Sequence, residues 1–397
     1  MNNNILDFIA QETLGTAIRC QRYSFEAVSM PRVEYDRDTG EFGAREKVYA
    51  ETNPKFLPNG ICLKDKADEL LNMGRRYCRN RFFLDGTRRT YKIGDIRYGS
   101  RIYPVIAGQT VVGYCERAEG DIIGNDYKHD IVICLPEVIE DDAALDIELF
   151  IADLVNKTNK KLSEKWNGNL KLSTILPYKV QLGEHEKLED KAISKIHDFM
   201  LNREKELVNE LAKLDRLTGP DGYLLKDGSI EYKQPTDTSK KTFSENIYIK
   251  SNYQYVIGVS KSFNPERVKG KNGKTDHTII SKLAPYCRTP VYRYNSYHTG
   301  GTEFGVWYVR IRHSNHDFQS PFDGVLKLEK VLITDEELEY GIDSEEIDTI
   351  TATIINERNP VCYASDSRWA NHVYPMHLTE RFLKNKLINT NIFMNVF

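Results

Sequence analysis

The sequence lacks several patterns that would assign the protein to a class at once. No hydrophobic run approaches the ~18–20 residues of a membrane span, and no basic segment followed by an apolar stretch opens the chain. We therefore expect no signal peptide, no membrane association and a cytoplasmic location. A GxxxxGK[ST] motif is also missing, which excludes a P-loop ATPase. The seven cysteines include no CxxC pair, so neither a zinc ribbon nor a disulfide framework is expected.

The charge balance excludes a globally basic nucleic-acid binder but leaves a local one open. The 397 residues are 40% hydrophobic and 28% charged, with a formal net charge of −3, and this composition is typical of a globular protein. DNA affinity follows the distribution of Lys and Arg rather than their sum. A carboxylate-lined metal site would also lower the total charge.

The first part of the chain reads differently from the rest. Residues 1–28 have helical periodicity, residues 31–60 read as a loop or short hairpin, and the segment from Lys64 to Met73 is again helical. We therefore predict a helical and loop segment over residues 1–75, followed by a domain over residues 76–397. Residues 120–190 are predicted to form an insertion with a helix from Ala144 to Asn156.

Two sets of strand-like segments flank a long charged helix, which runs from Lys187 to Leu217. The segments are rich in Ile, Val, Tyr and Phe and are broken by Gly and Asp. The first set is RFFLDGTRRTYKIGD, RIYPVIAGQTVVGYCERAEGD and DIVICLPEVI, and the second is GYLLKDGSIEYK, YQYVIGVSKSF, GVWYVRIRH and DGVLKLEKVLI. A last helix, YPMHLTERFLKNKL, begins at Pro375. The pattern predicts an α/β fold with a mixed sheet.

Two of these strands end in the same way, in Asp-Gly followed by a hydroxyl residue. FFLDGT carries Asp85 and YLLKDGS carries Asp227. If the strands are neighbours, the two carboxylates converge and offer the hard oxygen ligands that Mg²⁺ and Mn²⁺ prefer. Two such ions can clamp the attacking and leaving oxygens of a phosphodiester. Alternatively, each Asp-Gly simply marks a turn after a strand.

The order of these motifs resembles that of the NurA family of nucleases. The early LDGT strand is followed by antiparallel strands, a Glu-rich helix and YLLKDGSI. The strand YVIGVSKSF with Lys261, the strand VWYVRIR and the aromatic-Pro segment VYPMHL then complete the series. The resemblance covers residues 78–390, although residues 120–190 contribute little to it.

The resemblance implies a fold, an activity and partners. The fold would be RNase H-like, related to the nuclease domain of Argonautes, with flanking helices. The activity would be cleavage of DNA ends with Mn²⁺ or Mg²⁺, with Asp85 and Asp227 as metal ligands. The partners would be a second copy of the chain and a hexameric HerA-type ATPase that translocates DNA, in end resection or in anti-phage defence.

Further site residues are expected from the long helix and the second strand set. Glu206 and Glu210 lie four apart, on one helical face, and either could supply a third acidic ligand; both could instead belong to a solvated charged face. Lys261 stands in an otherwise apolar strand and could hold a phosphate and stabilise its charge. Alternatively, it reaches from the strand end to water.

Members of the family carry a late histidine near the metal, in a Pro-rich segment that begins a helix. This chain offers His372 and His377 around Tyr374-Pro375. Alignment on Tyr-Pro instead brings Glu380 and Arg381 to the expected position. The sequence therefore leaves the fourth ligand open.

Basic residues interleaved with aromatic ones suit a channel for single-stranded DNA. Each could equally belong to a solvated strand face. The predicted DNA contacts are Arg88, Arg89, Lys261 and Arg310, with Lys92, Arg293 and Arg312 nearby and the loop Lys269–Lys274 as a further candidate.

Two other functions remain possible from the sequence. Asp221, Glu231 and Lys233 fit the degenerate PD…ExK pattern of restriction-type nucleases, in which the two acids bind metal and the lysine assists the attacking water. This alternative leaves the Asp85 strand unexplained. The other is a non-catalytic DNA clamp or adaptor on the motor, which would keep the fold without the metal site.

Overall fold

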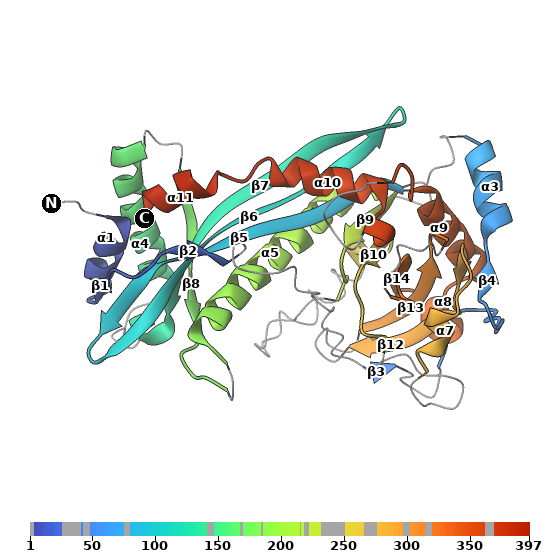
Figure 1. Ribbon diagram of the computed structural model, residues 1–397, viewed down its shortest axis with the longest axis horizontal. Coiled ribbons are helices and arrows are strands. Elements are labelled where there is room, and N and C mark those ends of the chain that lie inside the picture. Colours follow the sequence, from blue (N-terminus) through green and yellow to red (C-terminus); the bar gives the residue numbers. More distant parts are fainter. Residues whose placement is uncertain are drawn as a thin grey trace.

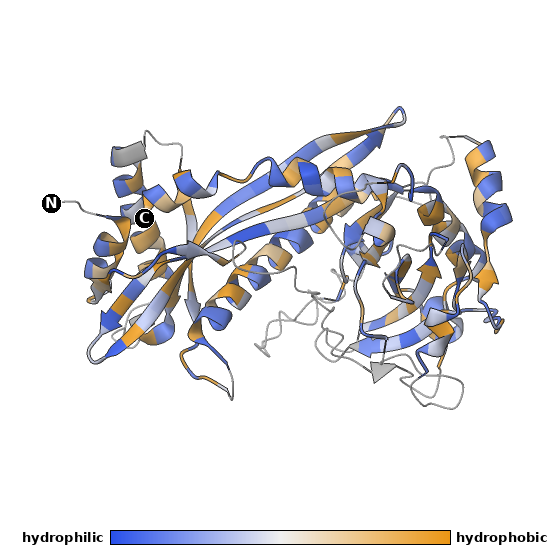
Figure 2. Ribbon diagram, in the orientation of Figure 1, coloured by the Kyte–Doolittle hydropathy of each residue, from blue (hydrophilic) through white to orange (hydrophobic). Residues whose placement is uncertain are grey.

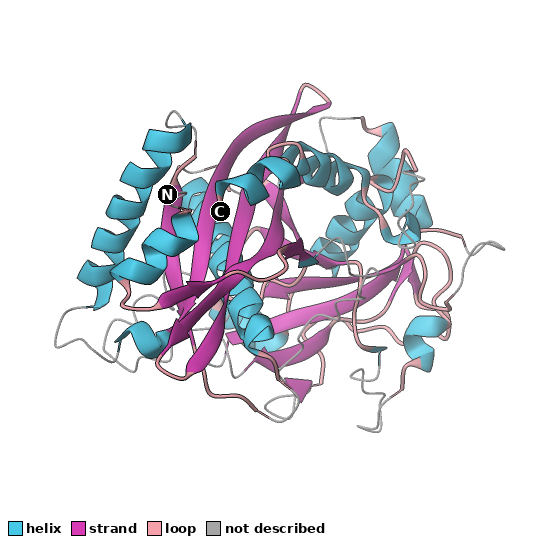
Figure 3. Ribbon diagram, turned by 60° about the vertical axis from the view of Figure 1, so that its left-hand side comes forward, coloured by secondary structure: helices cyan, strands magenta, loops and turns pink. Residues whose placement is uncertain are grey.

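The computed structural model describes most of the chain, with helices on both sides of a large sheet (Figure 3). The described residues are 4–25, 41–42, 48–74, 80–140, 147–166, 170–183, 186–214, 216–217, 222–231, 251–265, 276–296, 302–313, 320–361 and 369–397. Every structural statement below concerns these residues.

The sheet is mixed, and its main path runs in the order β3-β12-β13-β14-β10-β9-β5-β6-β7-β8. The strands β1, β2, β4 and β11 pair alongside that path. The bounds are β1 Thr16–Ile18, β2 Tyr23–Ser24, β3 Glu41–Phe42, β4 Ile61–Cys62, β5 Asn80–Tyr98, β6 Arg101–Ala118, β7 Asp121–Pro136, β8 Leu172–Tyr178, β9 Tyr223–Asp227, β10 Val256–Ser260, β11 Cys287–Arg288, β12 Tyr292–Ser296, β13 Thr302–Arg310 and β14 Val325–Val331.

Three long strands form the centre of the molecule. The strands β5, β6 and β7 pair antiparallel in succession, as the sequence predicts. Gly99 and Gly120 stand in the two tight connections with positive φ angles of 58° and 98°, a conformation that glycine adopts without a steric penalty. The strands β9 and β10 then join β5 in parallel. The predicted class is confirmed as a mixed α/β fold.

Helices cover both faces of this sheet (Figure 1). Helix α5 packs against one face, and helices α9 and α10 pack against the other. Their apolar residues accordingly belong to two different core clusters. The helix bounds are α1 Ile5–Glu12, α3 Lys64–Asn72, α4 Ile147–Trp166, α5 Leu188–Lys213, α7 Thr278–Ser281, α8 Asp335–Tyr340, α9 Ser344–Asn356, α10 Tyr374–Lys384 and α11 Thr390–Val396, with short 3-10 turns at Glu137–Glu140 and Trp369–Asn371.

Alternation along β5 and β9 decides which side chains meet which helix. Leu84 and Leu224 pack in the cluster that contains α5, whereas Phe83 and Leu225 pack in the cluster that contains α9 and α10. Because successive side chains of a strand point to opposite faces, the residues that follow continue the same alternation. Figure 2 shows the resulting mixture of polar and apolar segments along the strands and helices.

The N-terminal segment contributes to the same sheet. The helix expected over residues 1–28 is limited to α1, because β1 and β2 follow it and pair antiparallel with β5. The helix expected from Lys64 to Met73 is confirmed as α3. Strand β4 pairs with β11, so residues from the predicted 1–75 segment extend the sheet of the predicted 76–397 domain.

The predicted insertion over residues 120–190 also belongs to the sheet. Its first part is β7, the third strand of the antiparallel set, and its last part contains β8, which pairs in parallel with β7. Between them, α4 runs from Ile147 to Trp166, beyond the Asn156 at which the sequence places its end. Leu154 and Leu162 of this helix pack in a cluster with Ile5 and Ile9 of α1.

No helix within the described ranges has the length and apolar character needed to cross a membrane.

Candidate active site

Two aspartates meet on one face of the sheet where β5 and β9 run side by side. The parallel register pairs Leu84 with Lys226, so Asp85 and Asp227 are the next residues along each strand. Asp85 lies two residues after Phe83, and Asp227 two residues after Leu225. Both aspartates therefore point to the same face as these apolar residues, the face covered by α10. Asp85 is 8% exposed, and its Oδ1 accepts a hydrogen bond of 2.7 Å from the backbone N–H of Gly86.

A lysine that follows the adjacent strand contacts Asp227. Strand β10 runs parallel to β9 and pairs Val259 with Asp227, and Lys261 follows the end of β10. Its Nζ donates to Asp227 Oδ2 at 2.7 Å, and its side chain is only 8% exposed. The structure thus brings together three residues that the sequence picks out as site candidates.

Helix α10 adds a third carboxylate, Glu380. Thr379, the residue before it, is buried, and its hydroxyl donates to the backbone carbonyl of Pro375 at 2.9 Å and lies 3.4 Å from that of Phe83 in β5. Glu380 is partly buried and pairs with Lys384 at 2.6 Å. Burial raises the pKa of Glu380, but Lys261 and Lys384 outweigh it and hold that pKa below its usual range.

The electrostatics show an excess of negative charge around one buried cation. Burial, and then the charge of Asp227, raise the pKa of Asp85 well above its ordinary value, although Lys261 opposes them. Burial disfavours the charged form of Lys261, but Asp227 and Asp85 together raise its pKa. Carboxylates that resist ionisation beside one another are stabilised by a further cation. The arrangement therefore favours binding of a positively charged ion.

The two histidines lie next to this group. His372 is 3% exposed just before α10, and its ring centroid is 5.5 Å from that of His377. Burial, and then His372, lower the pKa of His377, and Glu380 opposes them. A neutral imidazole is the form that binds metals. The structure thus places both predicted histidines near Glu380, the residue that the Tyr-Pro alignment indicates.

A buried ion pair supports the two aspartates from the opposite face. Glu204 Oε2 lies 2.7 Å from Lys226 Nζ, and both side chains are almost fully buried. Lys226 Nζ also donates to the backbone carbonyls of Asp227 and Ser229, at 3.1 and 3.2 Å. A Cβ on Gly86 would stand only 2.4 Å from Glu204 Oε1. Lys226, held by Glu204, therefore fixes the end of β9 that carries Asp227. Strand β5 does not end at Asp85-Gly86, where the sequence predicts its end, but continues to Tyr98 because it stays paired with β6.

Sequence reasoning missed Glu204, although a signal was present. The apolar stripe of α5 contains Ile196, Met200, Leu207 and Leu211, and Glu204 stands between Met200 and Leu207 in that stripe. A charged residue at a core-facing position of a helix must have a buried partner. Here that partner is Lys226.

The two glutamates that the sequence favours lie on the exposed side of α5. Glu206 pairs with Arg203 at 2.7 Å and Glu210 with Lys128 at 2.5 Å, and both side chains are about half exposed, at 48% and 49%. Each helical residue is rotated by about 100° from the one before it, so neither shares the direction of Glu204. The structure does not bring them to Asp85, and their surroundings match the solvated alternative.

The predicted DNA contacts divide into different environments. Arg88 faces α5 and lies 2.9 Å from His197 Nδ1, whereas Arg89, the next residue, lies on the Asp85 face by alternation. Arg310 is 4% exposed, and its guanidinium donates to four backbone carbonyls, those of Ser281, Leu283, Pro321 and Asp323. Its hydrogen bonds hold loops together, so the structure places Arg310 in the core and away from the site.

Two buried arginines, Arg293 and Arg312, also serve the core. Arg293 pairs with Glu303, and Arg312 donates to the backbone carbonyls of Ala370 and His372. Lys92 pairs with Asp95 and Glu189. The loop Lys269–Lys274 lies outside the described residues.

Of the three residues in the restriction-type alternative, the structure describes Glu231. Glu231 accepts a hydrogen bond of 3.1 Å from the hydroxyl of Tyr294, whereas Asp221 and Lys233 lie outside the described residues.

The oxygen ligands at Asp85 and Asp227 are of the kind that binds a divalent cation. Carboxylate oxygens from Asp85, Asp227 and Glu380 are hard ligands, and burial together with the nearby Asp227 raises the pKa of Asp85. However, no three His, Cys, Asp or Glu side chains in the described part of the chain are grouped closely enough to hold a metal ion. The ammonium of Lys261 instead contacts Asp227.

Comparison with known proteins gives similarity to solved structures but not to sequences or family models. No protein-family model matches the chain, and no curated protein matches its sequence significantly. The fold is similar to that of the NurA nuclease from Sulfolobus solfataricus, with a TM-score of 0.38 and 12% sequence identity, over 81% of this chain and 85% of that chain. This is the family that the sequence motifs resemble.

Proposed function

We propose that the chain is a divalent-metal-dependent DNA nuclease whose site is built on Asp85 and Asp227. The observation that carries the proposal is the meeting of the buried Asp85 and the partly buried Asp227 on neighbouring parallel strands, beside Lys261 and Glu380. Paired carboxylates on one face of a sheet with an adjacent cation are suited to hydrolysis of a phosphate ester.

Asp85 and Asp227 would hold Mn²⁺ or Mg²⁺, and Glu380 is the nearest described candidate for a third ligand. A bound ion would supply an activated water and would neutralise charge on the phosphate. The chain's own part is to keep the two aspartates at fixed positions. Lys226 does this for Asp227 by holding the backbone that carries it.

Lys261 would position the scissile phosphate. Its ammonium is buried against Asp227 and stays charged because Asp227 and Asp85 raise its pKa. A positive charge fixed in a partly desolvated site stabilises the charge that develops on a phosphate during hydrolysis. Arg89, on the same sheet face and partly exposed, would contact the DNA backbone beyond it.

The partners rest on the sequence resemblance alone. It implies that the nuclease acts as a homodimer on DNA delivered by a HerA-type hexameric translocase, in end resection or in defence against phage. The dimer, the motor and the process stay predictions.

A non-catalytic DNA clamp is the second candidate, and one observation favours it. The Lys261 ammonium already forms an ion pair with the Asp227 carboxylate. The described residues also contain no group of three side chains that could hold a metal ion. A lysine that permanently replaces the metal would leave a DNA-binding protein without hydrolytic activity.

Cleavage of end-labelled linear single- and double-stranded DNA tests both candidates. Wild type, Asp85→Asn and Asp227→Asn would be compared with Mn²⁺, with Mg²⁺ and with EDTA, each with and without a HerA-type ATPase. The matched control is Glu206→Gln, which removes an exposed carboxylate from the nearby helix. We expect metal-dependent cleavage by wild type and control, and a loss of at least about 100-fold in both aspartate variants.

DNA binding without cleavage under any of these conditions would select the clamp. Equal activity in all four proteins would contradict the Asp85–Asp227 site.

A further inference from the structure

Two cysteines that are distant in the sequence face each other in the sheet. Strands β4 and β11 pair antiparallel, and Cys62 is the direct register partner of Cys287. Both are free thiols. Opposite residues of an antiparallel pair have Cα atoms about 4.5–5.5 Å apart, within the range of about 4.4–6.8 Å that a disulfide requires. The fold therefore places these two sulfurs where a bond between them needs little backbone movement.

The two thiols differ in their access to solvent. Cys62 is exposed, whereas Cys287 is 4% exposed. Burial, and then the proximity of Cys62, raise the pKa of Cys287 to about 12. An oxidant from solvent therefore meets Cys62 first, and Cys287 lies directly behind it as a second thiol that solvent does not reach.

The other described cysteines have no such arrangement. Cys115 and Cys134 are buried, and the residues opposite them across the β6–β7 pairing are Gly124 and Ile106. Cys20 is partly exposed at the other end of the molecule, near Asp95. The Cys62–Cys287 pair thus differs from them in combining an exposed thiol with a facing one.

We propose that Cys62 and Cys287 form a reversible disulfide when the protein meets a hydroperoxide. The Cys62 thiolate attacks a peroxide oxygen, the O–O bond breaks, and a sulfenic acid forms at Cys62 with release of water or an alcohol. The sulfur of Cys287 then attacks Cys62 Sγ, the S–O bond breaks, and water leaves with the proton of Cys287. The peroxide takes two electrons in total from the two thiols, and an external dithiol restores them by exchange.

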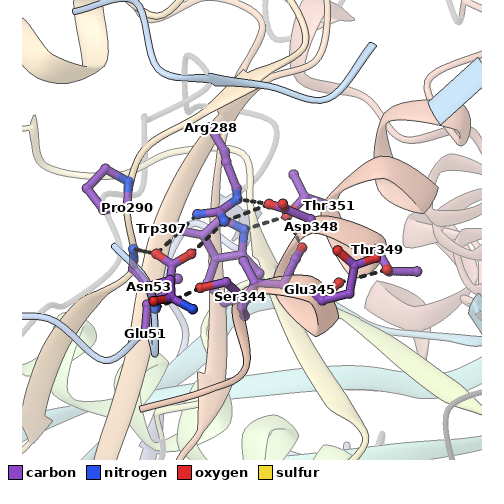
Figure 4. A network of polar contacts seen from close by, with 12 residues as sticks. Glu51, Asn53, Arg288, Pro290, Trp307, Ser344, Glu345, Asp348, Thr349 and Thr351 are labelled. Carbon is purple, nitrogen blue, oxygen red and sulfur yellow. Dashed lines mark hydrogen bonds and ion pairs between the residues drawn. The ribbon is translucent and has the colours of Figure 1, made fainter. Parts of the chain in front are cut away.

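The disulfide would join covalently two segments that are already docked. Arg288, the neighbour of Cys287, is almost fully buried and binds Glu51 and Asp348, each at 2.6 Å (Figure 4). Leu63, the neighbour of Cys62, donates its backbone N–H to the carbonyl of Tyr286 at 2.9 Å. Oxidation would therefore lock the segment that carries β4 and α3 onto the sheet, and reduction would release the lock. This proposal does not depend on the nuclease activity.

The test is peptide mapping of the native full chain after treatment with hydrogen peroxide. Wild type is compared with Cys62→Ser and Cys287→Ser, and with Cys20→Ser as the matched control. In wild type and control we expect the loss of two thiols and one cross-linked peptide pair that contains Cys62 and Cys287. Dithiothreitol should restore both thiols.

Each single variant supplies a different readout. In Cys287→Ser the sulfenic acid at Cys62 should persist and react with dimedone, whereas in wild type this adduct should fall by at least about tenfold because Cys287 removes it. If Cys287→Ser does not fold, Cys62→Ser, changed at the exposed position, should still lose the cross-linked peptide. An unchanged thiol count, equal dimedone labelling in wild type and Cys287→Ser, or a cross-link from Cys62 to another cysteine would overturn the proposal.

Discussion

At the residue scale, two lysines act on Asp227 from opposite faces of the sheet. Lys261 contacts its carboxylate, while Lys226 binds its backbone carbonyl and pairs with Glu204. The carboxylate that we assign to the metal is thus fixed by a partner on its own face and by a buried ion pair behind it. Asp227 therefore depends on a helix that does not share its face.

Loss of one member of the buried pair should be costly. Lys226→Met leaves the Glu204 carboxylate buried without its cation, so we expect a loss of about 3–5 kcal/mol in the free energy of unfolding. Glu206→Gln, which breaks an exposed ion pair, should change it by no more than about 0.5 kcal/mol. Urea unfolding followed by circular dichroism measures both. A Lys226→Met protein as stable as the control would mean that Glu204 and Lys226 do not form this pair.

Gly86 should tolerate no side chain. A Cβ there would stand 2.4 Å from Glu204 Oε1 and 3.2 Å from Met200, in a packed interior, so we expect Gly86→Ala to cost about 1–3 kcal/mol. The matched control is Gly183→Ala, whose Cβ would approach Glu186 Oε2 at 2.9 Å; that exposed side chain can turn away. Thermal unfolding compares the two variants, and equal melting temperatures would contradict the close approach.

At the scale of elements, the N-terminal cap of α8 should make the stability of the protein depend on pH. Glu337 accepts from the backbone N–H groups of Ile333 and Thr334 and pairs with Lys330 at 2.5 Å. Burial raises the pKa of Glu337, but Lys330 outweighs it and the net pKa is lowered. A lowered folded-state pKa contributes stability above the unfolded-state value of ~4.3, and that stability is lost as the pH falls through the folded-state pKa.

Glu337→Gln should therefore destabilise the protein by about 1–2 kcal/mol at neutral pH. The difference in unfolding free energy from wild type should shrink as the pH is lowered from about 5 towards about 3, because wild type then loses the same charge. Urea unfolding at a series of pH values measures this, and a difference independent of pH would show that the carboxylate charge has no role in the cap.

Some elements could be predicted from the sequence and others could not, for physical reasons. The strands that carry Asp85 and Asp227 have strong apolar patterns, although only β9 ends at its Asp-Gly. The late helix begins at Tyr374, with Pro375 in the first turn, a position that suits proline. In contrast, α9 contains TITATII, and β-branched residues favour strands. It is helical because Ile347, Ile350 and Ile354 pack against the sheet, a tertiary effect that local propensity does not contain.

The same limit applies to the site. The sequence favours Glu206 or Glu210 as a third metal ligand, but the residues of α5 that face the sheet are decided by the rotation of the helix, which turns Glu204 towards Lys226 instead. That rotation follows from Met200 and Leu207 packing into the core. Lys226 is next to Asp227 in sequence yet lies on the other face, which only strand alternation within the formed sheet makes clear.

At the scale of the whole molecule, residues far apart in the chain share one sheet. The segment that contains Glu51 is bound to β11 and α9 through Arg288, which is 1% exposed (Figure 4). Arg288→Met would leave the fully buried side chain of Glu51 without its cation. We therefore expect a loss of about 3–5 kcal/mol and faster hydrogen exchange over residues 49–63.

The matched control is Lys66→Met, which removes an ion pair to the exposed Glu345 in the same region. It should leave hydrogen exchange over residues 49–63 close to that of wild type. Mass spectrometry of exchanged peptides reports both variants, and equal protection in Arg288→Met and Lys66→Met would mean that Arg288 does not hold this segment.

The most direct test of a metal-dependent site at Asp85 and Asp227 is Mn²⁺ binding, because cleavage can depend on a motor that binding does not need. Isothermal titration calorimetry of wild type, Asp85→Asn, Asp227→Asn and Glu206→Gln at neutral pH measures it. We predict that wild type and Glu206→Gln bind Mn²⁺ alike and that each aspartate variant binds at least about tenfold more weakly. No binding by wild type, or equal affinity in all four proteins, would contradict the account.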